Sequence, residues 1–220
     1  MVIDLEAATR RELTLTEWII IINVIVFIIE MFAYVPMILW LSLIPAFVFQ
    51  GIQLWRLITH MFLHADFLHI FFNMYALYVF GKDVESTFGR NYFLILYFGS
   101  GLAGALFFSF MAVYFYKTPL VFSLGASAAV FGVMAAYAFL FPNRRLMIWF
   151  GFVVIRTRAK YFALGYAILE LLRAIFLGPY GGVAYAAHVG GFIFGVLITF
   201  YLKRKLWARP TYVYSPVVYY

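Results

Sequence analysis

Long apolar runs, separated by short basic or turn-forming clusters, constrain this chain more than any other feature. A helix needs about 20 residues to cross roughly 30 Å of hydrocarbon. Six runs come close to that length: Trp18–Tyr34, Leu57–Phe80, Tyr92–Tyr116, Leu124–Phe141, Tyr161–Leu177 and Val183–Leu202. Hydrophobic residues make up 66% of the 220 residues and charged residues only 11%, which excludes a soluble globular domain. We therefore expect the all-α fold class, as a polytopic membrane protein built from a bundle of six transmembrane helices.

Three further segments are expected to lie outside the membrane-spanning runs. The first span should be broken by Pro36, and Met37–Gln50 is apolar but only about 14 residues long, so it should be half sunk in the outer interface. Gly81–Arg90 has the composition of a polar turn. Leu146–Ile155 is apolar yet too short to cross, so we expect an interfacial piece there.

The basic residues predict the orientation of the bundle. A net charge of +7 could indicate a nucleic-acid partner, but the basic residues form short clusters between the apolar runs, as topology signals do. Only Arg56, Lys117 and Arg173 fall on the side opposite the termini, so both termini should be cytoplasmic, and we expect the plasma membrane. A seventh crossing would destroy this asymmetry. The expected organisation is a cytoplasmic N-terminus over 1–16, a membrane domain over 17–205 and a cytoplasmic tail over 206–220.

Ser127, His188 and His69 are expected to lie at one depth. Counting 1.5 Å per residue from the cytoplasmic ends of their helices places them roughly 22, 22 and 18 Å above those ends. That level is about 10 Å below the outer edge of the hydrocarbon, where polar side chains usually face the bundle interior or a wet cavity. A serine among small residues can also serve only helix packing, so Ser127 needs a neighbouring base to act as a nucleophile.

His188 is the candidate base because small residues follow it. Gly191 and Gly195 are four residues apart, which is typical of a close-packing helix face on which a histidine merely bonds across to a neighbour. The alternative is that these glycines bring the sixth helix close to the fourth, at Gly125, so that an imidazole nitrogen reaches the Ser127 hydroxyl.

His69 and Asn73 are four residues apart and should share one helical face. Both can donate hydrogen bonds, which suits a developing oxyanion beside the Ser127 backbone N–H, although an ordinary interhelical hydrogen bond is the simpler interpretation. A metal site is a further alternative because His60 and His64 have the same spacing. The absence of cysteine and the single nearby carboxylate, Asp66, argue against it.

These residues together resemble the rhomboid intramembrane serine proteases. The resemblance covers nearly the whole chain and depends on four motifs in order: Trp55-Arg56, HADFLHIFFN at His64–Asn73, GASA at Gly125–Ala128 and AHVGG at Ala187–Gly191, with Gly81, Glu85 and Gly89 matching the turn after the second helix. It implies a rhomboid-like six-helix fold with Ser127 as nucleophile and His188 as base. It also implies an oxyanion hole formed by His69, Asn73 and the Ser127 amide, with Gly125 and Gly191 as close-packing positions.

Two positions depart from the commonest pattern of that family. Ala128 stands where many members have glycine, and Phe131 stands where a tyrosine often stacks on the catalytic histidine. Phenylalanine keeps the ring, so ring packing should survive. No acidic residue is placed by the sequence to orient His188, so a Ser-His dyad is expected rather than a triad.

The sequence therefore predicts an intramembrane serine endopeptidase that cleaves transmembrane segments near the outer face. No cofactor and no metal are expected; the partners are transmembrane protein substrates and the lipid bilayer, without nucleic acid, and the oligomeric state is left open. The resemblance implies substrates with a locally unstable helix and a small residue before the scissile bond. The alternatives are a catalytically idle client-binding relative and a small proton-coupled transporter that uses His60, His64, His69 and Asp66.

A substrate held in lipid can reach a buried serine only if part of the bundle moves. The fifth span is the expected gate, because the glycine-rich turn Gly178–Gly182 follows it. A tight surface turn is the alternative interpretation of that segment. Phe176 and Leu172, in the outer half of the span, are the bulky residues expected to close the gate.

Overall fold

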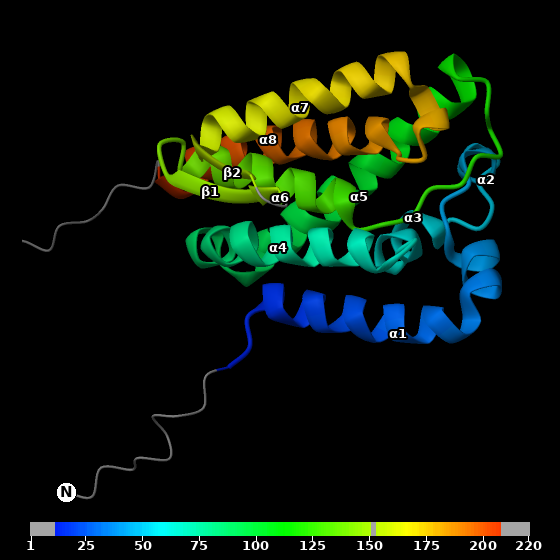
Figure 1. Cartoon of the computed structure of the whole chain (residues 1–220), viewed down its shortest axis with the longest axis horizontal. Helices are drawn as coiled ribbons and strands as arrows, with labels where there is room; N and C mark the ends of the chain where they lie inside the picture. The colour runs from blue at the N-terminus through cyan, green and yellow to red at the C-terminus, as the bar shows by residue number, and fades with distance from the viewer. Residues whose placement is uncertain (1–11, 151–152, 208–220) are drawn as a thin grey trace, which may run out of the picture.

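Six long helices lie side by side in the part of the chain that the computed structural model describes, residues 12–150 and 153–207 (Figure 1). They are α1 (Leu15–Leu41), α4 (Phe67–Phe88), α5 (Arg90–Phe110), α6 (Ser127–Leu140), α7 (Ala159–Phe176) and α8 (Tyr185–Trp207). Each of them overlaps one predicted span. The start of α1 and the end of α8 lie at the same end of the bundle. Residues 1–11 of the predicted N-terminus and 208–220 of the predicted tail lie outside the described residues.

Short elements connect the long helices. Between α1 and α4 lie α2 (Pro45–Phe49), α3 (Arg56–Thr59) and the 3-10 turn η1 (His60–Phe62); α5 continues as the π-helical turn η2 (Met111–Phe115), and the 3-10 turn η3 (Gly178–Gly181) joins α7 to α8. Within the described residues, three helices are long and apolar enough to cross a membrane, namely Leu15–Leu41, Arg90–Phe115 and Tyr185–Trp207, and α6 is a shorter apolar helix. The chain is thus a multi-pass helical membrane protein.

Helix α6 forms the centre of the bundle. Every residue from Ala128 to Ala138 is buried, as expected for a helix that is apolar on all sides. Helix α8 crosses it at glycines: a Cβ on Gly191 would lie 2.1 Å from the Ala128 carbonyl oxygen, and one on Gly195 would lie 2.4 Å from the Gly132 carbonyl oxygen. Only residues without a side chain allow backbones to approach so closely.

The boundaries of the first two long helices differ from the prediction. Helix α1 reaches Leu41, but non-helical backbone angles at Ala33 form a kink between two helical stretches, so the predicted break lies three residues before Pro36. A proline clashes with the preceding turn and bends a helix there, which explains a kink three residues earlier. The half-sunk segment predicted from Met37 therefore starts inside α1.

The predicted polar turn at Gly81–Arg90 is wrong, because α4 continues through it to Phe88 and ends at Gly89, whose φ is +81°. Its polar residues contact the start of α1. Glu85 accepts hydrogen bonds from the backbone N–H groups of Leu15 and Thr16, each at 2.8 Å. Those N–H groups have no acceptor within their own helix, so Glu85 caps α1 from a neighbouring helix.

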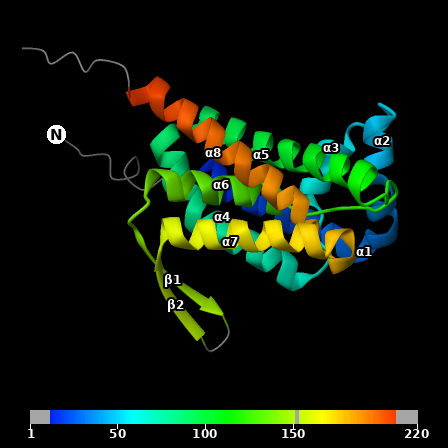
Figure 2. The same cartoon turned by 90° about the horizontal axis from the view of Figure 1, so that it is seen from above.

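The all-α class is wrong for the segment after α6. Strands β1 (Arg145–Phe150) and β2 (Val153–Arg158) pair antiparallel from Arg145 opposite Arg158 to Phe150 opposite Val153. The hairpin extends from the bundle beside the start of α7 (Figure 2). Its cross-strand hydrogen bonds satisfy the backbone groups of a segment too short to form a spanning helix.

The Trp55-Arg56 motif has a structural function. The buried Arg56 guanidinium donates to the carbonyl oxygens of Ser42 and Leu39, both at 2.6 Å. The Trp55 indole donates to the Trp40 carbonyl oxygen at 3.1 Å. The motif therefore binds the carbonyl groups left free at the end of α1 and fixes the connection that leads to α4.

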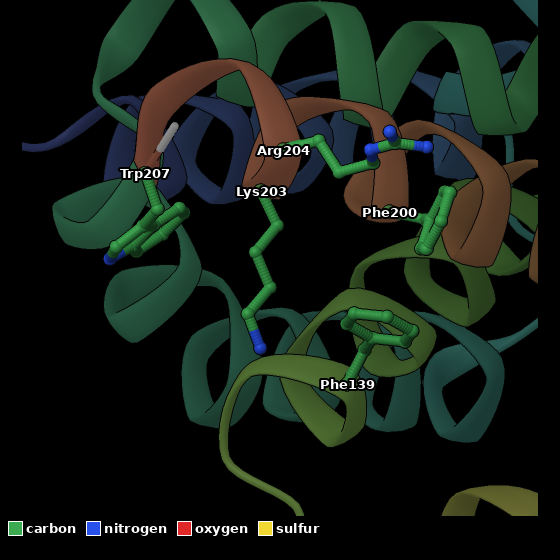
Figure 3. Close-up of a pocket in the computed structure, with 5 residues that line it drawn as sticks. All are labelled: Phe139, Phe200, Lys203, Arg204 and Trp207. Atoms are coloured by element: carbon green, nitrogen blue, oxygen red, sulfur yellow. The ribbon is translucent and has the colours of Figure 1, made fainter. Parts of the chain in front are cut away.

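A shallow hollow of about 460 Å³ lies at the C-terminal end of α8. His188 lies at the opposite end of the same helix. The hollow is lined by Phe139, Phe200, Lys203, Arg204 and Trp207, with the Lys203 side chain directed toward Phe139 (Figure 3). Basic and aromatic side chains together at a helix end are typical of the boundary between bilayer and water. This end of α8 therefore has the composition of an interface.

Candidate active site

The loop before α6 fixes the position of Ser127. Leu43 and Ser123 form an antiparallel bridge, and the Gly125 N–H donates to the His60 carbonyl oxygen at 2.8 Å. Gly125 has φ +120°, and a Cβ there would lie 2.8 Å from the His69 imidazole. A side chain at position 125 would therefore be strained and would collide with His69. Ser127 follows two residues later as the first residue of α6.

Ser127 and His188 are in direct contact. The distance from His188 Nε2 to Ser127 Oγ is 2.7 Å, and His188 is 7% exposed. The two residues come from the first turns of α6 and α8, which the glycines at 191 and 195 hold against each other. A serine hydroxyl within hydrogen-bond reach of an imidazole is the arrangement that activates a nucleophile.

Ring packing orients the imidazole of His188. The Phe131 ring stacks on it with centroids 4.4 Å apart and planes at 7°, so the expectation that phenylalanine preserves the stack is confirmed. Tyr166 of α7 in turn packs on Phe131 at 4.9 Å. The other departure, Ala128, is accommodated by glycine on α5, because a Cβ at Gly104 would lie 2.6 Å from the Ala128 methyl.

A carboxylate contacts His188, contrary to the prediction that no acidic residue is placed there. Glu170 Oε2 lies 2.6 Å from His188 Nδ1, and Glu170 is 1% exposed. The sequence contained a signal for this contact. Glu170 lies seven residues before Leu177, or roughly 10 Å below the end of its helix, which is the depth predicted for Ser127.

His69 and Asn73 are positioned at the start of α4. His69 occupies the first turn of α4, where the Asp66 carboxylate caps its backbone N–H at 2.8 Å. Asn73 donates through Nδ2 to the His69 carbonyl oxygen at 2.9 Å, and the second hydrogen on that nitrogen remains available. Both residues line one cavity together with Ser127 and His188.

That cavity has a volume of about 870 Å³. It extends from the loop before α6, at Val121–Leu124, past Ser127 to Leu146, Met147 and Ile148 of β1, and side chains of α4 and α7 line its walls. The α7 side chains in it are Phe162 and Tyr166, whereas Phe176 is 79% exposed. Phe176 and Leu172 therefore do not line the cavity, and their contribution to a gate stays a prediction.

The remaining histidines do not form a metal site or a continuous chain. His60 Nδ1 lies 2.8 Å from the Arg56 carbonyl oxygen. His64 is buried against His69, with ring centroids 5.0 Å apart, and its backbone N–H donates to Glu30 at 2.9 Å. In the described part of the chain there is no group of three His, Cys, Asp or Glu residues that could hold a metal ion.

Three helix N-termini converge on this site, because Ser127, His188 and His69 each occupy the first turn of a helix. The first backbone N–H groups of a helix have no intrahelical acceptor and carry partial positive charge. The Ser127 N–H is one of them. The arrangement therefore combines a base-contacted hydroxyl with donors and helix dipoles that favour negative charge beside it.

Known proteins are similar to this chain over most of its length. Residues 51–205 match the family model described as Rhomboid domain. The chain is 30% identical over 151 residues to Rhomboid protein 1, mitochondrial, of Saccharomyces cerevisiae, covering 66% of this chain and 41% of that protein. It is 29% identical over 197 residues to Rhomboid-like protease 3 of Toxoplasma gondii, covering 86% of this chain and 69% of that protein. With Rhomboid protease AarA of Providencia stuartii, identity is 31% over 161 residues, covering 66% of this chain and 54% of that protein.

Proposed function

The chain belongs to the rhomboid family, and on that premise we propose that it is an intramembrane serine endopeptidase with Ser127 as nucleophile and His188 as general base. The observation that carries the proposal is the 2.7 Å contact between Ser127 Oγ and His188 Nε2, two residues that line one cavity. The chain spans 41% and 54% of the length of two of the relatives described above and 69% of the third. Activity and substrates are therefore proposals for this chain.

The reaction is acyl transfer in two steps. His188 Nε2 takes the proton from Ser127 Oγ as this oxygen attacks the carbonyl carbon of the scissile peptide bond, and a tetrahedral oxyanion forms. The oxyanion collapses, the C–N bond breaks, and His188 donates its proton to the leaving amine. Water then attacks the acyl-enzyme with His188 again as base, which releases the acid product and regenerates Ser127.

The oxyanion has three candidate donors. The Ser127 backbone N–H is free at the start of α6, Asn73 has an unused hydrogen on Nδ2, and the His69 imidazole lies against Gly125, two residues before Ser127. Donors that are already positioned stabilise a charge that develops only during the reaction, which is where such groups accelerate catalysis most.

The cavity supports a transmembrane segment as substrate. Its walls include aromatic and aliphatic side chains of two different helices, α4 and α7. An apolar chain could pass between these helices to reach Ser127, and the hydrophobic lining would compensate for leaving lipid. We propose α7 as the element that moves, with Phe162 rather than Phe176 closing the passage.

The number of spans, orientation and membrane are further parts of the proposal. Six crossings with both termini in the cytoplasm are supported by the distribution of Lys and Arg along the sequence. The names of the relatives do not support the proposed plasma membrane, because the Saccharomyces protein is mitochondrial. Protease protection of terminal tags, combined with membrane fractionation, tests the orientation and the compartment separately.

The deciding experiment incubates the purified full chain in detergent or liposomes with a model transmembrane substrate that has a small residue before the intended cleavage site. We expect the wild type to cleave it, and Ser127→Ala and His188→Ala each to reduce cleavage to background without unfolding, since both act in one proton transfer. Substrate binding without cleavage by the wild type would indicate the idle client-binding relative. Proton-coupled transport that survives Ser127→Ala would indicate a transporter.

A further inference from the structure

We propose that Glu170 is the positioning residue for His188, so that the site works as three hydrogen-bonded side chains, Ser127, His188 and Glu170, rather than as a dyad. The inference rests on the proposed protease function. It assigns a role in the reaction to a residue on α7, the helix that forms a wall of the cavity.

Each carboxylate oxygen of Glu170 has a polar partner. Oε2 lies 2.6 Å from His188 Nδ1, and Oε1 accepts from Arg173 Nη1 at 3.0 Å. The Glu170 side chain is 2% exposed, whereas that of Arg173 is 41% exposed. A buried carboxylate is tolerated when it is paired and hydrogen-bonded, and here one partner is the imidazole that contacts the nucleophile.

The contact determines which imidazole nitrogen carries the proton. An ionised carboxylate can only accept hydrogen bonds, so its 2.6 Å contact requires the hydrogen on Nδ1. The neutral ring then has a lone pair on Nε2, directed at the Ser127 hydroxyl 2.7 Å away. When Nε2 takes the serine proton, the carboxylate stabilises the imidazolium that forms. Glu170 itself neither gains nor loses a proton in this sequence.

Because Glu170 lies on α7, the orientation of the His188 imidazole depends on the packing of α7 against α8. The buried residues of α7 are Ala159, Ala163, Glu170 and Ala174, so Glu170 is the one large buried side chain on α7. The buried alanines provide little packing area, so separation of α7 from the bundle mainly breaks the contacts of Glu170 and of partly buried rings such as Tyr166, which packs on Phe131. Any such separation removes the carboxylate from Nδ1. His188 is therefore correctly oriented only while α7 is docked.

The test uses two readouts on the full chain in detergent. A small fluorophosphonate that reaches Ser127 from water reports the nucleophilicity of the serine without any need for a transmembrane segment to enter. Cleavage of the model transmembrane substrate gives kcat and KM. We expect Glu170→Gln to lower the labelling rate and kcat together, by a factor between about 10² and 10⁴, because an amide can donate to Nδ1 and leave Nε2 protonated toward the serine. KM should change little.

The conservative variant and a matched control separate orientation of His188 from simple tethering of α7. Glu170→Asp keeps the charge but is one methylene shorter, so its labelling rate should lie between those of wild type and Glu170→Gln. Tyr116→Phe removes a different polar contact of α7, in which the Tyr116 hydroxyl donates to the Ala174 carbonyl oxygen at 2.7 Å, and leaves His188 untouched. Its labelling rate should remain within about twofold of wild type.

Three results would overturn the assignment: wild-type labelling by Glu170→Gln, labelling by Glu170→Asp no faster than by Glu170→Gln, or an equal loss in Tyr116→Phe. If Glu170→Gln does not fold, Glu170→Asp decides alone: a slower rate with unchanged KM supports the proposal, and a wild-type rate refutes it. A wild type that neither labels nor cleaves refutes the protease function instead, so failure of the two proposals can be told apart.

Discussion

Replacing Gly191 by alanine tests whether the contact between α6 and α8 controls the site. The new Cβ would lie 2.1 Å from the Ala128 carbonyl oxygen and 2.8 Å from its carbonyl carbon. These are backbone atoms, so no side-chain rotation relieves the overlap. Ala128 directly follows Ser127, and Gly191 lies one turn after His188 on the same helical face. The overlap therefore occurs beside both reacting side chains.

The displacement can be estimated from these distances. An ordinary contact begins at 3.4 Å, so the two helices must separate by about 1.3 Å. If α8 moves as a rigid body, the distance from His188 Nε2 to Ser127 Oγ grows from 2.7 Å to about 4 Å, beyond hydrogen-bond reach. A misplacement of about 1 Å commonly costs about 100-fold in rate, and overpacking costs about 1–3 kcal/mol of stability. We expect kcat to fall about 100-fold.

Thermal unfolding, fluorophosphonate labelling and cleavage of a transmembrane substrate measure these effects separately. The matched control is Gly165→Ala, which makes the same substitution in helix α7 where a Cβ meets no atom within 4 Å. It should leave labelling unchanged and slightly raise stability through better helix propensity. Wild-type labelling and kcat in Gly191→Ala would refute the reasoning, because the two helices could then part without disturbing the serine and histidine.

Four further substitutions test other parts of the structure. Asn73→Ala should lower kcat by about 10² to 10³ with KM little changed, as loss of one oxyanion donor does; a raised KM with unchanged kcat would make Asn73 a substrate-binding residue. Phe162→Ala should speed cleavage of a transmembrane substrate but not labelling by a small probe, because its ring lines the cavity and lies 6.3 Å from that of Phe80. Phe176→Ala, at a position 79% exposed, should change neither, and equal effects of the two would argue against a gate at Phe162. Glu85→Ala should lower the free energy of unfolding by about 3 kcal/mol, because the first turn of α1 loses its charged acceptor; a chemical denaturation curve that coincides with that of wild type would contradict this.

The hydrophobic pattern predicted where the long helices are, but not where two of them end. Polar residues after Gly81 indicated a turn because polar groups usually leave the membrane interior. In the structure Lys82 pairs with Glu17 at 2.8 Å and Glu85 caps α1, so a neighbouring helix satisfies these groups and α4 continues. The hairpin was missed for a related reason. Its β-branched residues, such as Val154 and Ile155, favour strands, but pairing with β1 depends on contacts that an apolar segment of this length does not reveal.

The sequence by itself determined the position of each candidate residue along its helix. Helix rise is constant at about 1.5 Å per residue, so counting from the helix ends brought Ser127, His188 and His69 to one level. Only the tertiary structure decided how each helix is rotated about its own axis. Glu170 lies at that same depth, but its depth alone does not determine whether the carboxylate contacts lipid or His188. The alanines of α7 pack against the bundle, and this rotation turns the Glu170 carboxylate toward Nδ1 of His188. The rotation of a helix depends on which of its sides meets a complementary surface on the neighbouring helices, and that surface is formed only in the tertiary structure.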